Sequence, residues 1–290
     1  MTQGVQPDPS LIGGVPVPPF AILPDPARTF ATRQARFAFL ARSGNLAPYL
    51  GFLANLTGLQ VRLLADLPPV RASGPIDRAP LAADPTLHAT LAALCDSAAR
   101  IEMPDAARQA LEAVTLAEAQ DRAWLLANVL GDAIPADSAG PHLFAALAVQ
   151  VHLTRLAATL EAKALSPRGT GQCPACGGRP ATSTVTGAPG IENIRYACCA
   201  LCATQWNAVR ITCLCCGQGG KISYRSAETT DATVKAECCG DCNSWVKILY
   251  ATKNPTLDPI ADDVGSLGLD LMMQESGLVR AGANPFLVGY

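Results

Sequence analysis

The spacing of apolar residues predicts helices over the first half of the chain. Within 46–67, apolar residues recur at intervals of three or four, which is the period of one helix face: Leu50, Leu53, Leu56, Leu59 and Leu63. Similar spacing continues through 86–99, 105–132 and 140–165. Alanine and leucine are abundant here and β-branched runs are scarce, which also favours helix. We therefore predict an all-α domain of roughly five to seven helices over residues 27–165.

Three stretches rich in proline or glycine interrupt this helical pattern. The first 26 residues hold seven prolines and three glycines, which predicts an extended, poorly ordered leader over 1–26. Residues 66–85 hold five prolines and predict a linker or a long loop. The segment "SPRGTGQ" at 166–172 predicts a domain boundary.

Beyond this boundary the hydrophobic pattern becomes short and alternating. Runs such as "WVKILYAT", set among cysteines, glycines and threonines, predict short strands held together by metal knuckles. One more helix is expected near the C-terminus, with Asp258 as its N-cap, Pro259 at its first position and Gly277 at its end. Its apolar face is expected to hold Ile260, Val264, Leu267 and Leu271.

Length and composition allow a substantial hydrophobic core and argue against some classes of function. The chain has 290 residues, 49% of them hydrophobic, enough for one large domain or two ordinary ones. A net charge of −2 argues against a protein that binds polyanions over its whole surface. The most apolar run, 143–160, contains His152 and Arg155, so it predicts a buried helix and not a membrane span. Because the N-terminus lacks a basic segment followed by a long apolar one, we expect no secretory signal and a cytoplasmic location.

The cysteines supply the candidate chemistry. Eleven of the twelve lie between residues 173 and 242. They form four CxxC pairs: Cys173/Cys176, Cys199/Cys202, Cys213/Cys216 and Cys239/Cys242. The shift that carries Cys173 onto Cys213 places the first two pairs on the last two without a gap, so the segment is an internal duplication.

Each copy of the duplication provides four thiolates, which suit one zinc or one iron ion. Gly177 and Gly217 follow the second cysteine of the first knuckle in each copy, where a positive φ is often needed. Ala203 and Asn243 occupy that place in the second knuckles, and alanine tolerates the conformation less well than asparagine. The duplication favours pairing of knuckles within each copy, with a cross-braced arrangement as the alternative. A thioredoxin-type redox pair is disfavoured because the segment lacks a βαβ context.

The remaining cysteines are predicted not to be metal ligands. Cys198 and Cys238 each precede the third ligand of a copy, and neighbouring side chains of an extended segment point to opposite sides. We expect both to be small buried residues, Cys215 to be exposed inside its knuckle, and Cys95 to lie in the core of a helix.

No conventional active site can be recognised in the sequence. The histidines lie in the helical part, outside any catalytic motif, and are expected in the core or on the surface: His88, His142 and His152. Four arginines mark the first helix: Arg28, Arg33, Arg36 and Arg42. We interpret them as a solvated face, with a contact for an acidic stretch of a partner protein as the alternative.

Taken together, the segments "CPACGGRPATS", "RYACCALCATQWNAVRITCLCC" and "KAECCGDCNSWVKILY" resemble the formate dehydrogenase accessory protein (FdhE) family. The resemblance extends to "LPDPARTFATRQARFAFLA" at 23–41 and to the closing segment 258–288, and so covers nearly the whole chain. The chain departs from the family pattern at Cys198, where a histidine is common, which makes a ligand role for this residue less expected.

The resemblance implies a helical domain followed by two tandem rubredoxin-like or zinc-ribbon-like modules, at 172–210 and 211–253, and a C-terminal helix and tail at 254–290. It implies two metal ions per chain, held by the eight CxxC cysteines, with rubredoxin-type iron favoured over zinc. It also implies a cytoplasmic maturation factor that is not itself an enzyme. Such a factor contacts the catalytic subunit of formate dehydrogenase and is required for that enzyme to become active.

Two other functions stay open on the sequence alone. One is a rubredoxin-type electron carrier. The other, less favoured, is a zinc-ribbon protein that binds nucleic acid: between Arg168 and Lys253 nine Lys and Arg face five Asp and Glu. Four aromatic residues could stack on bases but are expected to pack under the knuckles instead: Tyr196, Trp206, Tyr224 and Trp245. The oligomeric state is undecided, and a homodimer remains an alternative.

Overall fold

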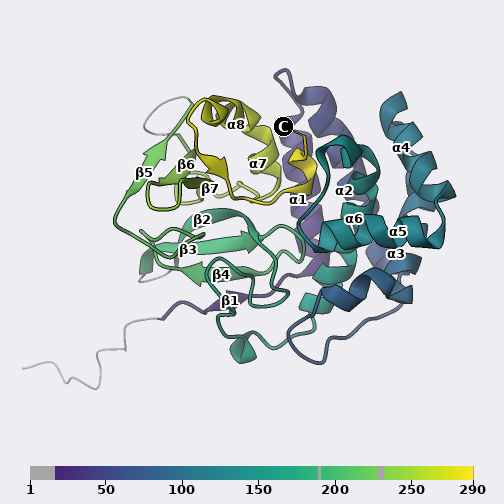
Figure 1. Ribbon diagram of the computed structural model, residues 1–290, viewed down its shortest axis with the longest axis horizontal. Helices are drawn as coiled ribbons and strands as arrows, with labels where there is room; N and C mark the ends of the chain where they lie inside the picture. Colours follow the sequence, from purple (N-terminus) through teal and green to yellow (C-terminus); the bar gives the residue numbers. More distant parts are fainter. Residues whose placement is uncertain (1–16, 189–190, 228–231, 290) are drawn as a thin grey trace, which may run out of the picture.

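Figure 1 shows the computed structural model, which describes residues 17–188, 191–227 and 232–289. Most of the helices occupy one side of the molecule and a single mixed sheet the other, with α1 between them, while the two short helices near the C-terminus lie on the side of the sheet (Figure 1). Most of the predicted leader, residues 1–16, lies outside the described part. The rest of the leader is not loose, because Ala21–Ile22 forms strand β1, which pairs with a strand of the cysteine-rich part.

Six α-helices confirm the prediction of a helical N-terminal region. They are α1 (Pro26–Leu40), α2 (Ala47–Asp66), α3 (Pro85–Ala98), α4 (Asp105–Leu116), α5 (Ala119–Leu130) and α6 (Ala139–Ala157). The stretch predicted to be helical over 105–132 is in fact two helices, because Ala117 and Glu118 adopt extended backbone angles. Short 3-10 turns lie at Ala79–Ala83, Ala136–Ser138 and Ala162–Ala164. The predicted helix over 140–165 ends at Ala157.

Helix α6 is the centre of the helical side. It is buried on nearly every face and packs against α2, α3, α4 and α5. Its apolar character all round is typical of a buried helix, as expected for the run that contains His152 and Arg155. Within the described residues, no helix is both long and apolar enough to cross a bilayer.

The sheet repeats the duplication seen in the sequence. The first copy contributes β2 (Pro180–Ala188), β3 (Ile191–Cys199) and β4 (Gln205–Ala208). The second contributes β5 (Ile222–Arg225), β6 (Val234–Cys239) and β7 (Ser244–Tyr250). The strand order is β1-β4-β3-β2-β7-β6-β5, with antiparallel pairing inside each copy. The copies join through a parallel β2–β7 pair, in which Thr182 lies opposite Lys247. Strand β8 (Val279–Arg280) pairs in parallel with the start of β7.

One hydrophobic core crosses the predicted domain boundary at 166–172. Buried residues of the helices, such as Leu56 and Phe144, belong to the same cluster as Ala175 and Leu201 of the first copy. A second, smaller cluster lies under the second copy and contains Ala236, Cys238, Trp245, Leu269 and Met273. The first copy is therefore packed into the helical part. The second also reaches the main core, through Leu214 and Val246, and has the small cluster as well. The boundaries of the two modules stay a prediction.

The C-terminal segment differs from the single helix predicted for it. It forms α7 (Ala261–Gly265) and α8 (Leu267–Gln274), broken at Ser266. The break changes the phase of the apolar face, so Leu271 is 52% exposed while Leu269 and Met273 are buried. Asp258 plays the predicted capping role, since its Oδ1 accepts hydrogen bonds from the N–H groups of Ile260 and Ala261.

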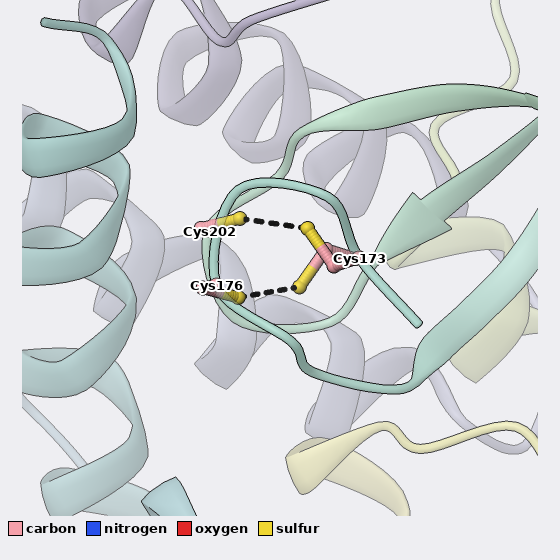
Figure 2. A group of neighbouring side chains, drawn as sticks. Cys173, Cys176 and Cys202 are labelled. Carbon is pink, nitrogen blue, oxygen red and sulfur yellow. Dashed lines mark hydrogen bonds between the residues drawn. The ribbon is translucent and has the colours of Figure 1, made fainter. Parts of the chain in front are cut away.

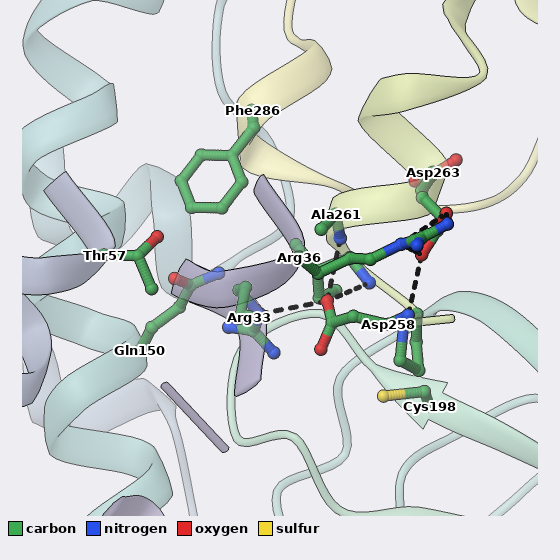
Figure 3. A network of polar contacts seen from close by, with 12 residues as sticks. Arg33, Arg36, Thr57, Gln150, Cys198, Asp258, Ala261, Asp263 and Phe286 are labelled. Atoms are coloured by element: carbon green, nitrogen blue, oxygen red, sulfur yellow. Dashed lines mark hydrogen bonds and ion pairs between the residues drawn. The ribbon is translucent and has the colours of Figure 1, made fainter. Parts of the chain in front are cut away.

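The prediction for the arginines of α1 is wrong at its two central members. Arg33 and Arg36 are buried and form ion pairs with Asp258 and Asp262 of the C-terminal segment (Figure 3). Arg36 Nη2 lies 2.7 Å from Asp262 Oδ1, and its Nε donates to Oδ2 at 2.9 Å, a bidentate arrangement. These two side chains are neither a solvated face nor a surface for a partner. They fasten α1 to α7, and only Arg28 and Arg42 of the set are exposed.

A second buried charge network fastens the C-terminal segment to the sheet. Lys247 of β7 is completely buried and pairs with Asp263 at 3.1 Å and with Asp270. Arg280 of β8 pairs with the same two carboxylates. Although burial opposes it, the charges of Lys247 and Arg280 lower the pKa of Asp263, which keeps the aspartate ionised.

Candidate metal centres

The first cysteine group lies where the sheet meets the helices. Cys173 and Cys176 come from the turn before β2, Cys199 ends β3, and Cys202 lies in the turn that follows. The four Sγ atoms all lie within 4.8 Å of one another. Cys173 Sγ is 3.5 Å from Cys202 Sγ, and Cys176 Sγ is 3.5 Å from Cys199 Sγ (Figure 2).

The second group repeats this geometry in the second copy of the duplication. Cys213 Sγ lies 3.7 Å from Cys242 Sγ, and Cys216 Sγ lies 3.7 Å from Cys239 Sγ. These four Sγ atoms also lie within 4.8 Å of one another. The sulfurs thus gather within each copy, as the duplication suggests, and not across the copies as in a cross-brace.

The sulfur positions fit a four-thiolate metal site. A tetrahedron with metal–sulfur bonds of about 2.3 Å has edges of roughly 3.8 Å, close to the separations in both groups. A disulfide would bring two sulfurs to about 2.0 Å, so no pair of described cysteines is joined in this way. Sulfur donors in this arrangement suit zinc or a single iron ion.

Backbone turns explain how each knuckle holds its sulfurs. Gly177 N–H donates to Cys173 O at 2.8 Å, and Gly217 N–H donates to Cys213 O at 3.0 Å. Both glycines have the predicted positive φ, 73° and 76°. Ala203 and Asn243 also adopt positive φ in the second knuckles, 56° and 53°. Ala203 therefore accepts a conformation that is unfavourable for alanine.

Each group also includes a hydroxyl that the sequence analysis missed. Cys202 Sγ donates to Thr204 Oγ1 at 3.2 Å, and Cys242 Sγ lies 2.9 Å from Ser244 Oγ. The same shift that relates the cysteines places Thr204 on Ser244, so the signal was present in the sequence. When the cysteine is a thiolate, the hydroxyl donates instead and stabilises the negative charge.

The two groups differ strongly in burial. All four cysteines of the first group are buried. Helix α6 covers this group directly, because Gln150 Nε2 donates to Ala200 O at 3.0 Å and Thr154 Oγ1 donates to Leu201 O. In the second group Cys216 is half-buried and Cys242 is solvent-accessible. One site is thus enclosed and the other faces solvent.

The thiols of the first group favour a localised negative charge. Hydrogen bonds from Cys173, Cys176 and Cys202 hold the pKa of Cys199 well below its usual value. Burial raises the pKa of Cys173 and of Cys202 well above it. A buried thiolate among thiols is a favourable position for a cation.

The cysteines that were predicted not to bind metal lie in the expected positions, with one exception. Cys198 is buried on the opposite side of β3, near Arg33 and Asp258 (Figure 3), and Cys238 belongs to the small core under the second copy. Cys95 is buried in α3, and burial raises its pKa to about 11. Cys215 was predicted to be exposed, but it is half-buried because it packs against the main core.

The histidines have structural positions. His142 is buried, and its Nδ1 lies 2.6 Å from Ser138 O. His88 Nε2 lies 2.8 Å from Ala82 O. His152 is buried and neither ring nitrogen has a hydrogen-bond partner among the described residues. Burial lowers the pKa of His142 and His152, so both are neutral imidazoles at pH 7.

The aromatic residues lack the exposure that base stacking requires. Tyr196, Trp206 and Trp245 are buried, and of the four only Tyr224 is exposed. Trp206 belongs to the main core and Trp245 to the small core under the second copy, as preferred on the sequence for packing over base stacking. This removes the main structural support for a nucleic-acid binder.

The loop before α3 contributes a residue that sequence reasoning missed. This segment was predicted to be a linker or a long loop, and it is a loop: Ile76 is buried and its N–H donates to Ala175 O of the first knuckle at 2.7 Å. Two residues later, Arg78 pairs with Asp132 at 3.1 Å and approaches the sulfurs of the first group. No sequence motif predicts that Arg78 lies near the first cysteine group, because it belongs to a loop that is far from these cysteines in the sequence.

Comparisons with known proteins give one consistent result. Three family models match in chain order: "FdhE, N-terminal" over residues 18–170, "FdhE, central domain" over 172–210 and "FdhE, C-terminal domain" over 211–287. A "Protein FdhE homolog" of Rhizobium meliloti (strain 1021) is 48% identical, with 99% of this chain and 98% of the relative covered. Another, from Proteus mirabilis (strain HI4320), is 33% identical, with 93% and 92% covered.

A solved structure supports the same relationship. The crystal structure of the FdhE protein from Pseudomonas aeruginosa superposes with a TM-score of 0.81 at 29% sequence identity. The match covers 93% of this chain and 99% of that one. The fold is thus shared over most of both chains.

Proposed function

The chain belongs to the FdhE family, and from this premise we propose that it is an accessory protein required for the assembly of active formate dehydrogenase. The observation that carries the proposal is the match of all three FdhE models, in chain order, from residue 18 to residue 287. The proposed client is the catalytic subunit of formate dehydrogenase. We place the protein in the cytoplasm, since clustered free thiols at metal-ligand spacing are typical of reducing compartments.

The eight CxxC cysteines are the proposed ligands of two metal ions per chain, with rubredoxin-type iron favoured and zinc as the alternative. The support is the donor set, since each copy offers four sulfurs at the edge lengths of a tetrahedral site. An ion bound there would cross-link two turns and, in the case of iron, could take up an electron. Elemental analysis and visible spectroscopy of anaerobically purified protein test this: two ions per chain are expected, and no bound metal would contradict it.

We further propose that the chain acts by binding and not by catalysis. Within the described residues, the imidazoles of His142 and His152 are buried, so neither is open to a substrate. The residues with chemically reactive side chains lie instead in the two cysteine groups. These groups hold the fold of the two modules together. The module boundaries 172–210 and 211–253 belong to this proposal.

Deletion and pull-down in the native host test the accessory role. Deletion of the gene should abolish formate oxidation without removing the catalytic subunit, and the tagged chain should recover that subunit. Complementation with C239S should fail, because Cys239 is a proposed ligand. C238S should restore activity, because this neighbouring cysteine points into the small core. Normal formate oxidation in the deletion strain would contradict the proposal.

One observation favours a second function alongside the first. The second cysteine group is solvent-accessible at Cys242, as an electron carrier would require for contact with a redox partner. A rubredoxin-like visible spectrum with reversible reduction would support electron transfer. A colourless protein that holds only zinc would remove it.

A further inference from the structure

The two candidate metal sites differ in how the excess negative charge of their thiolates can be neutralised. Four thiolates carry two more negative charges than a divalent ion neutralises. In the second group, water can solvate that excess, because Cys216 and Cys242 are accessible. In the first group all four cysteines are buried, and an uncompensated buried charge is costly. The enclosed site therefore needs a positive group nearby.

Arg78 occupies the required position. A Cβ atom placed on Gly178 would lie 3.3 Å from Cys199 Sγ, 3.4 Å from Cys176 Sγ and 3.4 Å from Arg78 Nη1. The guanidinium and the two sulfurs thus surround the same glycine. A side chain at residue 178 would fill the space between them.

The two nitrogens of Arg78 have different environments. Nη2 pairs with Asp132 Oδ2 at 3.1 Å, which fixes the guanidinium in place. Nη1 is buried and has no hydrogen-bond partner among the described residues. A buried guanidinium nitrogen without an acceptor is unusual and calls for a charge to balance it. Besides Asp132, the negative groups closest to this nitrogen are the sulfurs of Cys176 and Cys199 around Gly178.

The two copies differ at this position. The residue that corresponds to Gly178 is Gln218 in the second copy. The cation beside the first group belongs to the loop before α3 and not to the module itself.

We propose that Arg78 is a positioning residue of the first metal centre, where its positive charge offsets the excess negative charge of the four thiolates and retains the ion. This inference rests on the proposed binding of two metal ions per chain. It links the helical region to the first site electrostatically, in addition to the contacts from α6. The second site depends on solvent for the same purpose.

Zinc release from the full-length protein tests the proposal. Protein loaded with Zn²⁺ and mixed with excess chromophoric chelator should release one ion quickly from the exposed site and one slowly from the buried site. R78Q should accelerate the slow phase at least about tenfold and leave the fast phase unchanged, since charged partners of ligands typically alter metal affinity by this much. If the unmodified protein takes up no zinc, the proposed metal sites fail, which differs from a failure of the Arg78 assignment.

Three matched variants separate charge from shape. R78K keeps the positive charge and should retain most of the slow release. D132N leaves the cation but frees the guanidinium that the ion pair fixes, and should accelerate the slow phase less than R78Q does. R71Q lies in the same loop, away from the sulfurs, and should behave as the unmodified protein. The proposal is overturned if R78Q leaves the slow phase unchanged, if R78K releases zinc as fast as R78Q, or if both phases accelerate equally. Should R78Q fail to fold, R78K decides, because slow release supports the proposal and fast release overturns it.

Iron provides an independent readout. In iron-loaded protein, R78Q should lower the reduction potential of the first site, because reduction adds a negative charge that Arg78 would otherwise stabilise. The potential of the second site should not change. An unchanged potential at the first site would contradict the assignment.

Discussion

Individual buried charges hold the C-terminal segment in place, and Arg36 is the clearest case. The side chains of Arg36 and Asp262 are only 9% and 5% exposed. R36A should lower the free energy of unfolding by about 3–5 kcal/mol, because it leaves the Asp262 carboxylate buried without its partner. Urea denaturation measures this, with R28A on the exposed side of α1 as a control that should change stability by less than about 0.5 kcal/mol. A loss in R36A no larger than that in R28A would show that the pair does not fasten the segment.

His152 predicts a pH dependence of stability. Burial lowers its pKa in the folded chain, so the unfolded chain binds a proton more readily as the pH falls below about 6.5. The stability that the neutral imidazole contributes is present above this pH and is lost below it. Between pH 7.5 and 5.5 the wild type should lose about 1 kcal/mol more than H152Q. Because any metal sites are common to both proteins, this difference isolates the histidine, and parallel pH profiles would refute its assignment.

At the scale of single residues, local spacing predicted the cysteines but not the charges. The internal duplication predicted which sulfurs gather together, because both knuckles of a copy lie close along the chain. The partners of Arg33 and Arg36 lie near the other end of the chain, at sequence separations of 225 and 226. Helical spacing alone cannot distinguish an arginine that faces water from one that faces a distant aspartate. The same limit hid Arg78 in a loop that looked like a linker.

Among the elements, the knuckles make the next prediction, because Ala203 has a φ of 56°. A203G should raise the free energy of unfolding by about 1 kcal/mol, since glycine adopts this conformation without strain. N243G should have an effect close to zero, because asparagine already tolerates it. G177A should lower stability by about 1–2 kcal/mol, because the added methyl has room and only the backbone angle is unfavourable. Denaturation of the zinc-loaded variants measures all three, and a destabilising A203G would show that the turn is not strained.

Helix and strand prediction succeeded where a periodic pattern was long. The run of leucines in α2 and the apolar surface of α6 are both buried as expected. Prediction failed at two breaks, one without proline or glycine and one that directly follows Gly265. Ala117 and Glu118 separate α4 from α5, and Ser266 separates α7 from α8. Tertiary packing determines these breaks, and residue propensities do not reveal them.

On the scale of the whole molecule, the two modules differ in what supports them. The first shares the main core with the helices, whereas the second contributes fewer residues to it, such as Leu214 and Val246, and also rests on a small cluster that includes Trp245 and Met273. Removal of metal should therefore leave the first module folded and loosen the second. In chelator-treated protein, we expect iodoacetamide to label the second group first: Cys213, Cys216, Cys239 and Cys242.

Cys242 should lead this series, and mass spectrometry of the labelled peptides checks the order. Burial alone would raise the pKa of this accessible thiol, but hydrogen bonds from Ser244 and neighbouring thiols lower it to about 7. A large fraction is thus thiolate, the reactive form, at neutral pH. The four cysteines of the first group should react with iodoacetamide as slowly as Cys95 does. Cys95 is buried in α3, so it is labelled only when the whole protein unfolds. If Cys173 or Cys199 is labelled as fast as Cys242, the shared core does not hold the first module without metal, and the two sites are equally dependent on their ions.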